Sequence, residues 1–142
     1  MHHLRKNRLE YFKLNSTDKH KEGCSLCVGA ASEVLYDETE SLAVMHNRMP
    51  YDFFEAVKTT GEHYMIVPKQ HRDSLAEFTD SERRQYFDLI SKYEATGFSI
   101  YSRGAGSSTR SQPHQHTHLI KLAHKQPRFF VYITKPYFVL HR

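Results

Sequence analysis

Three histidines stand at alternate positions in the stretch RSQPHQHTHLIKL, residues 110–122. Because side chains alternate between the two faces of a β-strand, a strand here projects His114, His116 and His118 from one face. Three imidazoles make a poor apolar core, so they need polar partners, a metal ion or an anion. The stretch therefore predicts a strand within a polar site. The spacing alone leaves a metal site, a catalytic site and a solvated histidine-rich strand as alternatives.

A loop rich in glycine and serine, RGAGSSTRS, precedes the histidines. Its backbone amides and its hydroxyls, including that of Ser111, can approach phosphate oxygens closely. A neutral imidazole is nucleophilic at one ring nitrogen when the other nitrogen donates to a fixed acceptor. The combination favours phosphoryl or nucleotidyl transfer. Arg103 and Arg110 belong to this loop; contact with a distal phosphate is one interpretation, and a solvated position is the favoured one.

Two cysteines occur, Cys24 and Cys27, in the segment CSLC. In an intracellular chain this spacing suggests a metal half-site or a redox pair rather than a structural disulfide. Later histidines could complete a tetrahedral zinc site, and His71 and His114 are the candidates, with His63 in reserve. The alternative is two small buried cysteines that bind no metal.

The order of the expected elements favours one α+β domain over residues 1–142, with a few helices packed on an antiparallel sheet. The clearest helix lies within 79–97, where Thr79 and Glu82 form a capping box and Gly97 ends the helix. Another helix is expected from His2 to about Phe12, in an N-terminal extension that covers residues 1–22. The expected strands are 33–37, 41–47, a strand within 62–71, 98–102, the histidine stretch, and two more within 123–142, RFFVYIT and YFVLH.

Composition and charge restrict the location and the partners only loosely. No run approaches the length that spans a membrane, and the first residues lack the apolar segment of a secretory signal, so we expect a cytoplasmic protein. The formal net charge of +4 suits an anionic partner such as a nucleotide, although a solvated basic surface explains it equally well.

Four segments, in this order, resemble motifs of the histidine triad (HIT) superfamily of nucleotide hydrolases and transferases. They are CSLC, LAVMHNRMPYD, GEHYMIVPKQHRDSL and SQPHQHTHLI, and together they cover roughly residues 24–122. The resemblance implies a HIT-like fold and an enzyme that acts at the α-phosphate of a dinucleoside polyphosphate or a nucleoside phosphoramidate. It also implies a covalent nucleotidyl-histidine intermediate.

The resemblance also implies roles for individual residues. His116 matches the nucleophile, and His118 matches the third histidine, which contacts the phosphate. Ser111 matches the serine that hydrogen-bonds the phosphate and the leaving group. Asn47 matches the ribose-binding position. The implied partner is therefore a purine nucleotide or dinucleotide substrate; nucleic acid is not expected, because no nucleic-acid-binding module is recognisable.

In family members that carry the cysteine pair, two histidines complete a zinc site. The matching positions here are His71 and His114, which implies a structural zinc ion bound with Cys24 and Cys27. Family members are often dimers, so the resemblance also implies a homodimer.

The chain departs from the family pattern in several places. The spacers Gln115 and Thr117 are usually hydrophobic in the hydrolase branches. The nucleotidyltransferase and phosphorylase branches, which are closer to S-x-P-H-x-H, usually carry glutamine where this chain has His118. SRGAG replaces the usual N-x-G, and FFEAVKTT, residues 53–60, is inserted. A nucleotidyltransferase or phosphorylase, and a nucleotide-binding regulatory module with little activity, are therefore alternative functions.

Overall fold

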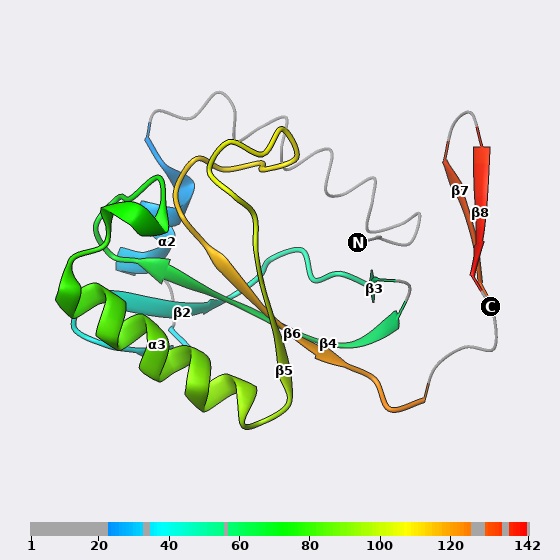
Figure 1. Ribbon diagram of the computed structural model, residues 1–142, viewed down its shortest axis with the longest axis horizontal. Helices are drawn as coiled ribbons and strands as arrows, with labels where there is room; N and C mark the ends of the chain where they lie inside the picture. Colours follow the sequence, from blue (N-terminus) through cyan, green and yellow to red (C-terminus); the bar gives the residue numbers. More distant parts are fainter. Residues whose placement is uncertain (1–22, 33–34, 56, 126–129, 135–136, 142) are drawn as a thin grey trace.

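The computed structural model describes residues 23–32, 35–55, 57–125, 130–134 and 137–141. The helix expected from His2 to Phe12 lies outside these residues. The described residues form an α+β structure with an antiparallel sheet and helices packed against it, as the sequence predicts (Figure 1). None of its helices is long and apolar enough to cross a membrane.

The sheet has six antiparallel strands in the order β1-β2-β4-β6-β5, with β3 paired to β4. The strands are β1 (Asp37–Glu38), β2 (Leu42–His46), β3 (Phe53–Phe54), β4 (Val57–Pro68), β5 (Phe98–Ser102) and β6 (Thr117–Leu122). The two strands expected at the C-terminus are β7 (Phe130–Thr134) and β8 (Tyr137–His141), which pair with each other.

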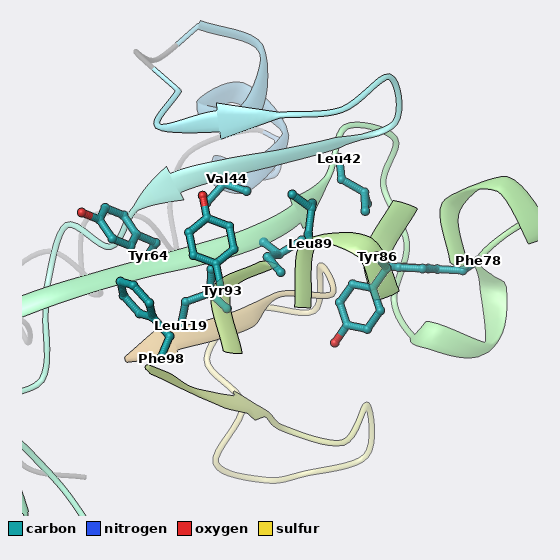
Figure 2. Close-up of a cluster of buried hydrophobic side chains, with 10 residues drawn as sticks. Leu42, Val44, Tyr64, Phe78, Tyr86, Leu89, Tyr93, Phe98 and Leu119 are labelled. Carbon is teal, nitrogen blue, oxygen red and sulfur yellow. The ribbon is translucent and has the colours of Figure 1, made fainter. Parts of the chain in front are cut away.

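Helix α3 (Asp80–Glu94) covers one face of the sheet (Figure 1). Its predicted start is confirmed, because Thr79 and Glu82 form a capping box, and Gly97 adopts a φ of +86° just beyond its end. A short 3-10 helix, η1 (Leu75–Glu77), precedes it. Aromatic and aliphatic side chains of α3 pack on those of β2, β4, β5 and β6 to form the main core (Figure 2).

Helix α2 (Ser25–Ser32) lies against the opposite face, where Leu26 packs with Met45, Met65 and Val67. This helix was not among the expected elements: Cys24 directly precedes α2 and Cys27 lies in its first turn. An eight-residue helix is too short to be stable alone, so packing on the sheet stabilises it. The sequence of these eight residues alone therefore gives little indication of a helix.

Two expected strands begin elsewhere. The strand expected over 33–37 is limited, in the described part of this region, to Asp37–Glu38. The histidine strand begins at Thr117, so His114 and His116 precede it. The reason is that the backbone N–H of Gln115 donates to the carbonyl of Arg72 at 2.6 Å rather than to a neighbouring strand.

Within the segment 53–60, β3 pairs with the start of β4 and so extends the sheet. Phe53 pairs with Lys58 and Phe54 with Val57, so β4 begins earlier than the sequence predicts. A β-bulge then interrupts the pairing of β4 with β6 between Thr59 and His63. Such a bulge re-aims the side chains that follow it, and the first of these is the buried His63.

Candidate functional site

One cavity brings together four residues that the sequence singles out. Asn47, Ser111, His116 and His118 all line it, beneath the first turn of α2. Asn47 comes from the end of β2, Ser111 from the glycine and serine loop, and the histidines from the start of β6. The alternation predicted for the histidine stretch brings His116 and His118 into one cavity, although only His118 belongs to the strand.

The proton on the His116 ring is fixed by the backbone. Its Nδ1 atom lies 2.8 Å from the carbonyl oxygen of His114, which can only accept a hydrogen bond. Nδ1 therefore carries the proton, and the lone pair is on Nε2. Burial lowers the pKa of His116, more than the His114 carbonyl raises it, and the charges of Arg110 and Arg103 lower it further. The ring is thus a neutral imidazole with one nucleophilic nitrogen.

A hydrogen bond from His63 sets which ring nitrogen of His118 carries the proton. The backbone N–H of Tyr51 donates to Nδ1 of His63 at 3.2 Å, so the His63 proton is on Nε2. That Nε2–H donates to Nδ1 of His118 at 2.9 Å, which leaves an N–H donor on Nε2 of His118. Burial, followed by the charges of His63, His116 and Arg103, lowers the pKa of His118 to about 2. His118 is therefore a neutral hydrogen-bond donor.

The sequence did not predict the position of His63 behind His118. It suggested His63 only as a reserve candidate for a zinc ligand. Its partner His118 is 55 positions away and meets it only because β4 pairs with β6. The amide nitrogen of Asn47 lies 3.1 Å from Nε2 and 3.5 Å from Nδ1 of the same ring. Near-equal distances to both nitrogens place the amide over the ring face, while its oxygen accepts from the Met49 N–H.

Aromatic rings support these histidines from the side of the inserted hairpin. The ring of Tyr51 lies 4.6 Å from that of His63 and 5.5 Å from that of His118. Tyr101 of β5 stacks on His118 at 6.0 Å, and Phe54 of the hairpin meets Tyr101 edge-on at 5.2 Å. The insertion thus contributes a buried phenylalanine to the wall behind the site.

The unusual spacers have polar partners on the other side of the strand. The hydroxyl oxygens of Thr117 and Tyr86, which belongs to α3, lie 2.7 Å apart. The Gln115 amide donates to the Ser102 hydroxyl at 2.8 Å and accepts from Arg110 at 3.3 Å. These hydrogen bonds within the protein therefore explain why Gln115 and Thr117 are polar.

The two arginines of the glycine and serine loop have different environments. Arg110 donates to the carbonyl of Asp73 at 2.7 Å as well as to Gln115. Arg103 lines the cavity, and its Nη1 donates to the carbonyl of Thr109. Both residues are half-buried, so a solvated position stays a prediction for each.

The four predicted metal ligands form a second cluster. Cys24, Cys27, His71 and His114 offer ligand atoms that all lie within 4.8 Å of one another. Nδ1 of His114 is 3.3 Å from the sulfur of Cys24 and 3.4 Å from that of Cys27. Nδ1 of His71 is 3.4 Å from the sulfur of Cys27. These separations are close to the roughly 3.5 Å edges of a tetrahedral site with two sulfur and two nitrogen ligands.

The protonation of the ligands also suits a metal. Nε2 of His71 donates to Asp73 at 2.9 Å, which leaves the lone pair of Nδ1 directed at the cysteines. Burial and the nearby His71 lower the pKa of His114 to about 4, so its ring is neutral. Burial and Cys24 raise the pKa of Cys27, which disfavours the thiolate that binds a metal. A bound cation would offset this effect. The cluster could therefore hold a metal ion.

His114 belongs to both sites. Its ring faces the cysteines, while its carbonyl oxygen accepts from the ring of His116. The cysteine and histidine cluster is therefore connected to the ring of His116 through the backbone carbonyl of a single residue, His114.

Comparisons with known proteins agree with this geometry. No family model matches the chain. The protein hit of Bacillus subtilis (strain 168) is 24% identical over 107 residues, which cover 70% of each chain. A HIT family hydrolase from Clostridium thermocellum is similar in structure, with a TM-score of 0.55 and 18% identity over 76% of this chain and 97% of its own. A histidine triad nucleotide-binding protein from Candida albicans has a TM-score of 0.54 and 16% identity over 74% of this chain and 83% of its own. The chain therefore has the histidine triad fold that the motifs imply.

Proposed function

We propose that the protein is a nucleotide hydrolase or nucleotidyltransferase of the histidine triad family. Its substrate is a purine nucleotide that carries either a second nucleotide through a polyphosphate bridge or an amine on the α-phosphate. The observation that carries the proposal is the hydrogen bond from His116 to the His114 carbonyl, inside a cavity lined by His118, Ser111 and Asn47. The hydrolase and the nucleotide-binding protein among the structural neighbours support the same chemistry.

The first step is an in-line displacement at the α-phosphorus. Nε2 of His116 forms a bond to phosphorus, and the bond between phosphorus and the leaving group breaks, with its electron pair departing on the leaving group. The ring then carries a positive charge, because Nδ1 keeps its proton. The His114 carbonyl, 2.8 Å from that nitrogen, stabilises the charge.

The second step releases the nucleotide. A water molecule attacks the phosphorus and loses a proton, the bond between phosphorus and Nε2 breaks, and its electron pair returns to His116. The Nε2–H of His118 and the Ser111 hydroxyl donate to the phosphate oxygens, on which negative charge develops. Asn47 contacts the ribose.

Zinc is the metal we propose for the cluster, because two thiolates and two imidazoles are its usual structural ligands. Cys24, Cys27, His71 and His114 would hold it. The ion would close the site with four protein ligands, and would therefore act on folding and on the orientation of His114 rather than on the substrate.

The covalent intermediate is the direct test. The protein is mixed briefly with adenosine 5′-phosphoramidate or diadenosine triphosphate, quenched in alkali, and weighed intact by mass spectrometry beside His116→Asn. We expect a mass gain of one adenylyl group in the wild type alone, and loss of turnover in the variant by at least about 10³-fold. Turnover by the wild type with no adduct, or an adduct on the variant, would contradict the role of His116.

Product analysis then separates the hydrolase from the transferase. The same reactions are run with and without inorganic phosphate. AMP as the product in both reactions identifies water as the acceptor. Formation of ADP from the phosphoramidate when phosphate is present identifies a phosphorylase, whereas diadenosine triphosphate releases ADP as its leaving group in either case. Binding of AMP with neither product identifies the regulatory module.

A further inference from the structure

We propose that Arg103 binds the negatively charged leaving group of a phosphoanhydride substrate, and so makes the site select dinucleoside polyphosphates over phosphoramidates. This inference rests on the proposed function and concerns a residue to which the family motifs give no role.

The position of Arg103 carries the argument. It directly follows β5, whose last residues pair with His118 and Thr117 of β6. Its side chain lines the same cavity as His116 and His118. Because Nη1 donates to the carbonyl of Thr109, the guanidinium is held back across the glycine and serine loop. Arg103 is therefore a half-buried cation beside the two histidines, in a position to meet an anion in the cavity.

The other arginine of the loop is a contrasting case. Arg110 does not line the cavity, and it contacts Asp73 and Gln115 behind the histidine stretch. Among the described residues that line the cavity, none is acidic, and Arg48 adds a second cation at the end of β2. The cavity thus suits a ligand with several negative charges.

The chemistry of the leaving group gives the substrate class. When His116 displaces a diadenosine polyphosphate at its α-phosphorus, the electron pair departs on a phosphate oxygen of a multiply charged nucleotide. A phosphoramidate nitrogen takes up a proton from water as its bond to phosphorus breaks, and it leaves as an uncharged amine instead. An arginine matches two phosphate oxygens with a planar pair of N–H donors, so it stabilises the first leaving group and not the second.

Two substrates with the same adenylyl group test this. We expect Arg103→Gln to lower kcat/KM for diadenosine triphosphate by roughly 30- to 300-fold and for adenosine 5′-phosphoramidate by less than about 3-fold. Arg103→Lys should keep part of the difference, since it retains the charge but not the planar donors. Arg84→Gln, on the exposed side of α3, removes the same charge and should change neither.

Equal losses on both substrates would mean that Arg103 only orders its loop, and no loss would mean that it makes no contact; either result overturns the inference. Binding provides a test that does not need catalysis. The ratio of the Kd values for AMP and ADP should exceed about 10 in the wild type and approach 1 in Arg103→Gln. An unchanged ratio refutes the inference, and failure of turnover and adduct formation in the wild type refutes the proposed function separately.

Discussion

The proton positions around the triad are set by a few neighbouring groups. The His114 carbonyl fixes His116, and the Tyr51 N–H fixes His118 through the ring of His63. The sequence could single out the histidines that the structure brings to the cavity and to the cysteines, because their type and spacing are local features. It could not assign His63, whose role arises from pairing between two distant strands and from a bulge.

The link through His63 leads to a prediction. His63→Leu removes the donor to His118, so His118 is no longer held with its proton on Nε2. We expect a fall in turnover of about 10- to 100-fold, while His63→Gln, which can still accept from Tyr51 and donate to His118, should lose less.

Nitrogen-15 NMR of the histidine rings provides a readout that simple destabilisation would not change. His118 should carry its proton on Nε2 in the wild type and in His63→Gln, and should show a mixture of tautomers in His63→Leu. Observation of the Nδ1–H tautomer of His118 in the wild type would rule out the hydrogen bond that His63 donates to it.

Among the elements, those with strong local signals were predicted and those that depend on packing were not. Helix α3 has a capping box and a glycine at its end, both visible in the sequence. Helix α2 is stabilised by the sheet. Strand β6 starts later than predicted because the backbone carbonyl of Arg72 accepts the hydrogen bond from the Gln115 N–H. The contact between α3 and β6 likewise explains Thr117, which looked anomalous in the sequence.

This contact can be measured with a double-mutant cycle. Tyr86→Phe and Thr117→Val each leave one buried hydroxyl without its partner, so each should lower the free energy of unfolding by about 1–3 kcal/mol. The double variant should lose less than the sum of the two, by at least about 0.5 kcal/mol, in urea denaturation. Strict additivity would show that the two hydroxyls do not interact.

At the scale of the whole molecule, the cysteine and histidine cluster joins α2, the segment after β4 and the segment before β6. The sequence predicted all four of its residues, because cysteine pairs and histidines have few other roles in combination. It kept His63 in reserve as an alternative to His71. The structure places His71 beside the cysteines, whereas β4 places His63 against His118.

Metal removal is therefore a test of the complete fold. We expect about one zinc ion per chain in elemental analysis, and a fall in Tm of roughly 5–10 °C on treatment with a chelator. Cys27→Ser should lose both the metal and the response to the chelator, whereas Ser32→Ala at the other end of α2 should keep both. A wild-type protein that carries no metal and does not respond to added zinc would leave the cysteines as packing residues.

The distribution of these ligands along the chain has a consequence for how the protein folds. Cys24 and His114 are 90 positions apart, and their side chains meet only across the assembled sheet. In a zinc finger the ligands are neighbours in sequence, so the ion can be captured early. Here, closing so long a loop is entropically costly, and contacts of this kind form late. Metal capture would accordingly be one of the last events in folding.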